Sequence, residues 1–186
     1  MSLSKRWSWP VAFQGEHAKV CENPGFLPRA WLASQVSPKK DLNEVIPSLR
    51  DPAFDPYAVA YLEEPLSSSL PLLQQTAKPV SNSGDLDRGT AAYTRVSPNR
   101  FRVATTCSSP KLLVVSQNWY PGWKARVNGK PRKVERVNGG LMGVPVEGGQ
   151  SEIDFSYRPT HFYWAAVMTL AAFAVLGGCF YKQDEL

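Results

Sequence analysis

Histidine and cysteine are scarce in this sequence, although many catalytic and metal sites depend on them. Of 186 residues only two are histidines, His17 and His161, and neither lies in a nucleophile motif such as GxSxG. The cysteines Cys21, Cys107 and Cys179 lie far apart and never as CxxC, so the ligand spacing of a structural zinc site is missing. We therefore expect no metal, no cofactor and no catalytic residue. The spacing leaves open whether Cys21 and Cys107 form a disulfide or all three thiols are free.

The charge is basic but not clustered. Lys and Arg number 21 against 16 Asp and Glu, which gives a net charge of +5. These basic residues accompany no nucleic-acid-binding motif, so we expect no nucleic-acid partner. A solvated surface is favoured over contact with an anionic membrane or polymer. The length excludes a multi-domain enzyme and allows one modest domain with an appendage.

A long apolar run lies near the C-terminus. Residues 162–181 read FYWAAVMTLAAFAVLGGCFY, without a charge and with aromatic residues at both ends. About 20 such residues are needed for a helix to cross the hydrocarbon of a bilayer, and aromatic rings favour its interfaces. The run predicts a transmembrane helix over 161–182, a short tail over 183–186, and the lipid bilayer as a partner. Ala174 and Gly178 form a small-residue pair that would let another transmembrane helix approach.

The N-terminus does not settle the side of the membrane. Its basic start, MSLSKRWSWPVAFQGEH, is followed by an apolar run too short for a signal peptide. A complete chain would be tail-anchored, with residues 1–161 in the cytoplasm. The end of a longer protein would allow earlier spans to place the same residues outside.

The remaining chain divides into three parts. Residues 1–64 form an N-terminal segment, with an amphipathic helix over 39–50 interrupted at Pro47 and a strand over 57–62. Residues 65–90 are rich in Ser, Pro and Gly and are interpreted as a linker or long loop. Residues 91–160 are the predicted β-sandwich core.

Alternating apolar and polar residues predict strands in this last part. Alternation is clear over 100–105 and 153–157, whereas 111–117 (KLLVVSQ) is more fully apolar. Asn128-Gly129 between two such runs is typical of a type I′ hairpin turn, which needs positive φ at both central residues. Six or seven short strands with this spacing predict a mainly β fold, an antiparallel β-sandwich of the jelly-roll or immunoglobulin-like kind.

Four ordered segments carry a family resemblance. They are ENPGFLPRAWL at 22–32, LRDPAFDPYAVAYLE at 49–63, the run WYPGWKARVNGKPRKV from Trp119, and VPV…SYRP ending at Pro159, followed at once by the apolar run. Together they resemble the C-terminal end of the YfhO family of bacterial multi-pass membrane proteins. Asn128 stands where that family usually has Asp, a change that the turn tolerates.

The resemblance implies a function that composition alone does not. Members of the family look like glycosyltransferases that use lipid-linked sugars, and their catalytic half would lie upstream of this chain. We expect a membrane-anchored, non-catalytic accessory β-domain that supports the handling of an envelope glycan or lipid-linked sugar, single-pass as given and extracytoplasmic at the bacterial inner or plasma membrane. The resemblance also suggests a fragment of a longer protein. The alternative is a stand-alone tail-anchored protein whose cytoplasmic domain binds a protein.

The candidate binding residues surround a Pro-Gly turn. Trp119, Tyr120, Trp123 and Lys124 offer aromatic faces and a polar group for a sugar ring, and packing of these aromatics at the sandwich edge is the alternative. Arg29 has the fork geometry suited to a phosphate or another anionic ligand, and a structural salt bridge is the alternative there. The acidic residues Asp51, Asp55, Glu63 and Glu64 are interpreted as turn or solvated surface residues.

Overall fold

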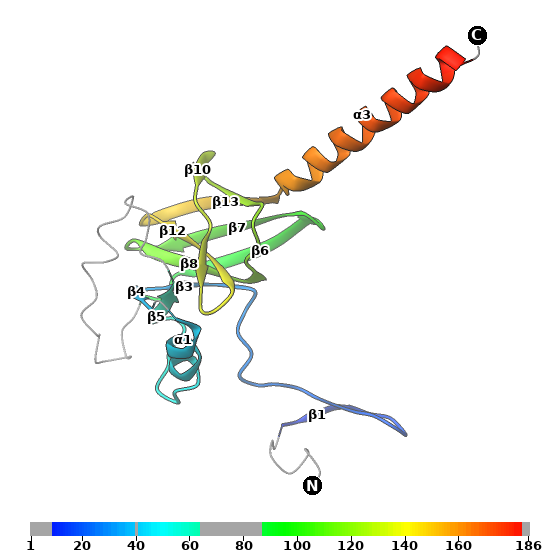
Figure 1. The fold of residues 1–186 in the computed structure, drawn as a ribbon. Helices are drawn as coiled ribbons and strands as arrows, with labels where there is room; N and C mark the ends of the chain where they lie inside the picture. Colours follow the sequence, from blue (N-terminus) through cyan, green and yellow to red (C-terminus); the bar gives the residue numbers. More distant parts are fainter. Residues whose placement is uncertain (1–8, 40, 64–86, 184–186) are drawn as a thin grey trace.

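A computed structural model describes residues 9–39, 41–63 and 87–183, and in the last helix the side chains of 162–175. Two larger sheets and a separate hairpin make up the strands within these ranges (Figure 1). Residues 65–86 of the predicted linker lie outside the described ranges, and residues 87–90 lead into the first strand of the five-stranded sheet. The tail residues 184–186 also lie outside them.

The five-stranded sheet is antiparallel throughout. Its strands, in spatial order, are β10 (Lys130–Arg132), β9 (Trp123–Val127), β13 (Gly149–Tyr157), β7 (Arg100–Cys107) and β6 (Thr90–Ser97). Burial alternates strictly along β7, because successive side chains of a strand point to opposite faces. The alternation predicted from the sequence is therefore confirmed, and the outer face of this sheet is open to solvent.

The six-stranded sheet draws on the N-terminal part of the chain. Its order is β3 (Ala30–Ala33), β8 (Lys111–Asn118), β12 (Leu141–Val146), β11 (Glu135–Val137), β5 (Val59–Leu62) and β4 (Gln35–Pro38). The packed sheets therefore extend beyond residues 91–160. The strand predicted over 57–62 is confirmed as β5, whereas β3 and β4 were not predicted, because four-residue strands are too short for a period to be read. The antiparallel prediction also fails at one pair, since β4 and β5 are parallel.

The two sheets share one hydrophobic core. Phe101 and Phe155 of the five-stranded sheet stack with ring centroids 4.5 Å apart, and they belong to the same buried cluster as Leu113 and Val144 of the six-stranded sheet. A second cluster covers the other face of the six-stranded sheet and includes Leu112 and Val114 of β8. Burial on both faces explains why β8 has a continuous apolar sequence.

The hairpin turn at Asn128-Gly129 has the predicted geometry. Asn128 has φ 49° and Gly129 has φ 79°, so both central residues lie in the positive-φ region that a type I′ turn requires. Asn138 and Gly139 repeat this geometry between β11 and β12, with φ 50° and 79°. These turns set the register of two antiparallel pairs.

The helix α1 (Leu42–Leu49) forms within the predicted segment, but the predicted interruption at Pro47 is wrong. The helix begins at an N-cap, where the Asp41 carboxylate accepts a hydrogen bond from the Asn43 amide at 3.1 Å. Pro47 lies in the last turn of an eight-residue helix, and the helix continues past it to Leu49. Val45 is fully buried, so tertiary packing stabilises a helix that the proline alone would weaken.

The predicted transmembrane helix over 161–182 also needs a correction. A helix does form there, α3 (Thr160–Gln183), which projects away from the sandwich (Figure 1). In the described part of the chain, no helix has both the length and the apolar character to cross a membrane. The structure describes the side chains of residues 162–175 in α3. Gly178 of the predicted small-residue pair lies outside these side chains.

The N-terminal hairpin was not predicted. It pairs β1 (Val11–Gln14) with β2 (Lys19–Cys21), and every residue of both strands is exposed. Figure 1 shows it well away from the two packed sheets. Cys21 is exposed in this hairpin and Cys107 is buried in the sandwich, and both thiols are free.

Candidate functional site

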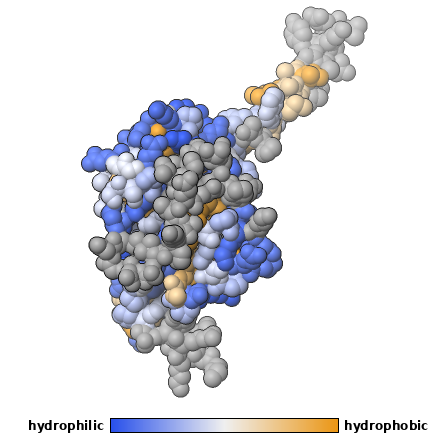
Figure 2. All heavy atoms as spheres, turned by 90° about the vertical axis from the view of Figure 1, so that its left-hand side faces the viewer, coloured by the Kyte–Doolittle hydropathy of each residue, from blue (hydrophilic) through white to orange (hydrophobic). Residues whose placement is uncertain are grey.

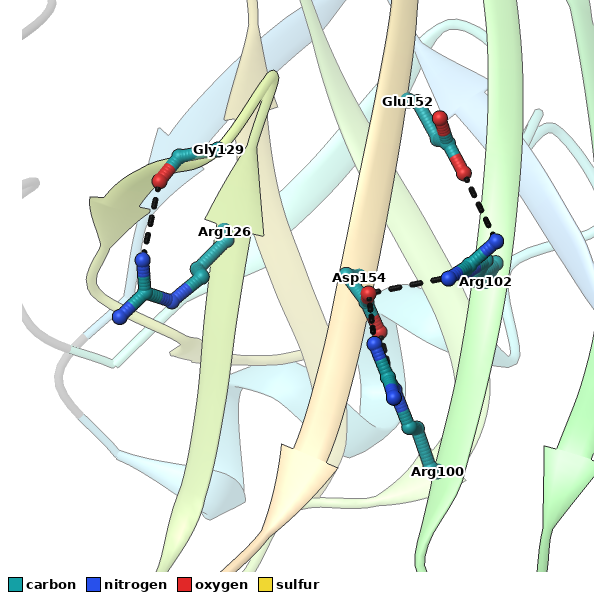
Figure 3. Close-up of polar contacts among 6 residues, drawn as sticks. All are labelled: Arg100, Arg102, Arg126, Gly129, Glu152 and Asp154. Carbon is teal, nitrogen blue, oxygen red and sulfur yellow. Dashed lines mark hydrogen bonds and ion pairs between the residues drawn. The ribbon is translucent and has the colours of Figure 1, made fainter.

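The solvent-exposed outer face of the five-stranded sheet carries a network of charged side chains and a hollow. Cross-strand register places Asp154 of β13 between Arg102 of β7 and Arg126 of β9. Glu152 lies two residues before Asp154 on β13, and its cross-strand neighbour on β7 is Ala104. Figure 3 shows the side chains of Arg102, Arg126, Glu152 and Asp154 on three neighbouring strands, on the same side of the sheet.

An ion-pair network crosses this face. The Arg100 guanidinium binds both carboxylate oxygens of Asp154, and its Nε lies 2.9 Å from Oδ1. Arg102 lies between the two acids, with Nε 3.5 Å from Asp154 Oδ2 and Nη1 3.4 Å from Glu152 Oε1. The hydrogen bond from Arg100 holds the pKa of Asp154 below its ordinary value. Asp154 therefore stays ionised at neutral pH and has no proton to donate as a general acid.

A hollow of about 710 Å³ lies on this face. Ala92 and Ala104 are among its smallest lining residues, while Arg102 and Glu152 supply charged groups. Thr94, Thr106, Asn128 and Gln150 add hydroxyl and amide groups. The small side chains explain the hollow, because longer ones at the same positions would fill it. We call this hollow the sheet-face groove.

Asn128 connects the groove to the hairpin turn beside it. The side-chain Oδ1 of Asn128 accepts a hydrogen bond from the backbone N–H of Glu152 at 2.8 Å. The backbone N–H of Asn128 donates to the Glu152 carbonyl, also at 2.8 Å. The positive-φ turn residue therefore also holds β13 next to β9. The sequence indicated the turn but not this second role, and it did not indicate the groove.

The four residues predicted to bind sugar are placed differently from one another. Trp119 is half-buried against the core, and its Nε1 donates to the Val134 carbonyl at 3.1 Å. Trp123 is half-buried between other aromatic rings, with centroid distances of 5.4 Å to Phe101 and 5.3 Å to Tyr157. In contrast, Tyr120 is 64% exposed and Lys124 is exposed. The packing accounts for both indoles without a ligand, so sugar binding by these four residues stays a prediction.

Arg29, the predicted contact for an anionic ligand, lies at the surface. Its Nη1 is 3.4 Å from the Ser116 carbonyl oxygen, and its guanidinium lies 5.9 Å from the centre of the Tyr93 ring. Among the described residues it forms no ion pair, so the alternative of a structural salt bridge is not observed there. Its predicted ligand role remains untested by these contacts.

A second, smaller pocket of about 130 Å³ lies beside Trp119. Lys133 Nζ lies 3.0 Å from Oε2 of Glu135, whose side chain is 3% exposed. Glu63 Oε1 lies 3.2 Å from Arg136 Nε, close enough for an ion pair but without hydrogen-bond alignment. These charges balance one another, so the pocket has no excess charge of either sign. The sequence singled out Trp119 and Glu63 but did not indicate that they share a pocket.

The helix α3 supplies an apolar surface of a different kind. Phe162, Trp164, Met168, Leu170 and Phe173 are each between 66% and 69% exposed. Figure 2 shows α3 leading away from a body that is mostly hydrophilic on the face in view. Exposed apolar area of this extent is unusual for a soluble monomer and marks an interaction surface.

These features define a mainly β domain, with two larger sheets packed on one core, that carries an exposed apolar helix and a polar groove on one sheet. Residues 79–169 match the family model described as "Bacterial membrane protein YfhO", so this part of the chain is a region of the YfhO type. The chain is also 24% identical over 74 residues to the "Uncharacterized protein YfhO" of Bacillus subtilis (strain 168), which covers 40% of this chain and 9% of that protein. No solved structure matches. The aligned segment is thus a small part of that relative's length.

Proposed function

We propose that this chain is a non-catalytic accessory β-domain of a YfhO-type membrane protein. The domain binds a cell-envelope glycan or the sugar of a lipid-linked donor, and the apolar helix α3 attaches it to the bilayer. The match to a bacterial membrane protein family supports the membrane location. The proposal also assigns a glycosyltransferase-like activity to the whole protein. The catalytic residues for that activity would lie upstream of this chain.

The sheet-face groove is the observation that carries this proposal. Its volume of about 710 Å³ lies within the range of roughly 300–1,000 Å³ that is usual for small-molecule sites. Carboxylate, guanidinium and amide groups line it, which are the acceptors and donors that a polyhydroxylated ligand needs. The strand β13 crosses the groove and leads through Arg158 and Pro159 into α3. Glu152 of the groove precedes Tyr157, the last residue of β13, by five residues, so a ligand in the groove would lie about 17 Å along the strand from the base of α3.

The charged groups in the groove and beside it favour binding over catalysis. A glycoside-cleaving pair needs one carboxyl group that keeps its proton near neutral pH. Asp154 is ionised because Arg100 stabilises its charge, and Glu152 is exposed and paired with Arg102. Asp154 therefore cannot supply the proton that such a pair needs. This supports an accessory role for the domain.

A binding experiment tests the groove. The chain in mild detergent would be probed with a glycan array of bacterial envelope oligosaccharides and with an undecaprenyl-phosphate-linked sugar. We expect Arg102→Ala and Glu152→Gln each to weaken binding about tenfold or more, since each removes a hydrogen bond to a charged group worth about 1.5–3 kcal/mol. Lys130→Ala, a change at an exposed cation outside the groove lining, is the matched control. Binding that the groove variants leave unchanged would contradict the proposal.

The orientation of the domain is a separate part of the proposal. We place the β-domain on the outer side of a bacterial inner or plasma membrane, as expected for the end of a multi-pass protein. Protease added to intact spheroplasts would then digest the domain, whereas cytoplasmic marker proteins would stay intact. Protection of the domain until the cells are lysed would exclude this orientation.

A cytoplasmic protein-binding domain is the second candidate. The exposed hairpin favours it, because Val11, Phe13 and Val20 are 46%, 62% and 54% exposed there. Apolar side chains on an exposed two-stranded hairpin are suited to contact another protein. The spheroplast experiment discriminates between the two candidates, because only the cytoplasmic domain is protected.

A further inference from the structure

Three segments of the sandwich meet at the base of α3. The Tyr157 amide donates to the Asn99 carbonyl at 2.9 Å, which joins the end of β13 to the β6–β7 turn. The Arg158 amide donates to the Gly122 carbonyl at 2.8 Å, which joins the helix connection to the β8–β9 turn. We call the surface made by residues 95–100, 119–124 and 156–159 the helix-base collar.

The collar carries positive charge only. Its sequences are RVSPNR, WYPGWK and SYRP, which contain four Lys or Arg residues and no Asp or Glu. Arg100 is engaged by the neighbouring Asp154. Arg95, Lys124 and Arg158 are exposed, and their side chains form no hydrogen bond or ion pair with the rest of the described chain. Three cations of the collar are therefore available to a ligand, and Lys124 and Arg158 are the two beside the start of α3.

Aromatic and apolar side chains accompany these cations. Tyr120 is 64% exposed and Val96 is 50% exposed within the collar. In the first turns of α3, Phe162, Tyr163 and Trp164 are 67%, 55% and 66% exposed. Aromatic rings next to Lys and Arg, at the base of an apolar helix, are typical of residues at the boundary between water and lipid.

The collar lies at the depth where headgroups would be. Lys124 is the cross-strand neighbour of Ser156, and neighbouring strands are about 5 Å apart. Only Pro159 separates Arg158 from Thr160, the first residue of α3. If α3 inserts its apolar surface into lipid, both cations come to the level of the phosphate groups.

We infer that the helix-base collar docks onto anionic phospholipid headgroups and so sets the domain against the membrane surface. This inference rests on the proposed attachment of α3 to the bilayer. Charge complementarity selects the partner, since the collar has no acid to repel a phosphate. Docking at the collar leaves the sheet-face groove to a different ligand, because Arg102 and Glu152 are not part of the collar.

Vesicle flotation of the full chain tests the inference. Binding would be compared on phosphatidylcholine vesicles with and without phosphatidylglycerol. Each basic residue near an anionic surface contributes about 1 kcal/mol, or roughly fivefold, so three residues predict a preference of about a hundredfold for the anionic vesicles at low salt. The preference should fall steeply as salt is added.

The decisive variant is Arg95→Gln/Lys124→Gln/Arg158→Gln. It should lose most of the anionic preference and keep its binding to neutral vesicles through α3. The matched control Lys19→Gln/Arg50→Gln/Lys130→Gln removes the same charge from exposed positions outside the collar and should keep the preference within about fivefold. Arg95→Lys/Arg158→Lys should also keep it, because the charge is retained.

Several results would overturn lipid docking. Equal binding to both kinds of vesicle, or equal losses in the collar and control variants, would remove the collar from the contact. Equal retention on soluble polyphosphate, lost in the collar variant, would assign the collar to a soluble polyanion. Absence of binding to either vesicle would refute the attachment of α3 as well, whereas glycan binding by the groove would be unaffected. If the triple variant melts at a lower temperature than the wild type, Lys124→Gln alone should still lower the preference about fivefold.

Discussion

Replacement of Gly143 by alanine tests the packing on the second face of the six-stranded sheet. Gly143 lies in β12, and a Cβ atom built on it would be 2.7 Å from Cγ1 of Val137 and 3.4 Å from Cδ2 of Leu112. Carbon atoms pack best at about 3.5–4.0 Å. Val137 and Leu112 are both fully buried, so neither side chain can turn toward solvent.

The expected cost of Gly143→Ala follows from this overlap. The contact to Val137 is about 1 Å too short, and overpacking a core by one carbon typically destabilises a protein by about 1–3 kcal/mol. A small domain has a total stability of roughly 5–15 kcal/mol, so the loss should be easily measured. Urea unfolding of the full chain in mild detergent, followed by tryptophan fluorescence, would give the free energy of unfolding.

Two further variants make this reasoning refutable. Gly140→Ala is the control, because a Cβ atom added at Gly140 would have no atom within 4 Å, and we expect a change within about 0.5 kcal/mol. Val137→Ala opens space beside Gly143, so the double variant Val137→Ala/Gly143→Ala should be more stable than the sum of the single losses predicts. A neutral Gly143→Ala, or strict additivity in the double variant, would refute the packing argument.

Three other predictions concern the sandwich and its turns. Hydrogen bonds from the Ser108 hydroxyl and amide lower the pKa of Asp87 from 3.8 to about 2, so its stabilising contribution is present above pH 3.8 and is lost as the pH falls toward 2; Asp87→Asn should flatten the fall in Tm over that range. Trp123→Ala should lower the free energy of unfolding by about 2–3 kcal/mol in the same urea assay, since its half-buried ring packs between two others; loss of glycan binding without destabilisation would instead support the sugar-binding prediction. Asn128→Ala should cost about 1–3 kcal/mol, because it leaves the Glu152 amide without its side-chain acceptor and puts alanine at positive φ, whereas Asn128→Asp should retain most of the stability.

The sequence predicted the local structure well where a short period or a turn rule applies. Alternation along β7 and β13 and the Asn128-Gly129 turn depend on neighbours a few residues away, and the structure confirms them. Pro47 shows the limit of such rules, because a local helix breaker was overridden by the burial of Val45. Local chemistry predicts an element only when no distant contact outweighs it.

The groove and the collar were beyond sequence reasoning. The groove and the collar each consist of residues from several strands, and the order of the strands in a sheet cannot be derived from local sequence patterns. The parallel pairing of β4 with β5 shows the same limit, since backbone hydrogen bonds between them carry no sequence signal.

The amino-acid sequence by itself determined the strands with clear alternation, the positive-φ turns, the apolar character of the C-terminal helix and the likeness of residues 79–169 to the YfhO family. These properties follow from side-chain chemistry and from spacing along the backbone. Only the tertiary structure decided that Trp119 and Trp123 pack against the core, that Arg100 and Arg102 pair with the acids of β13, and that the helix-base collar contains three cations without a partner in the described part of the chain. The physical reason is that burial and electrostatic pairing depend on distances between strands, which form only when the two sheets close on their shared core.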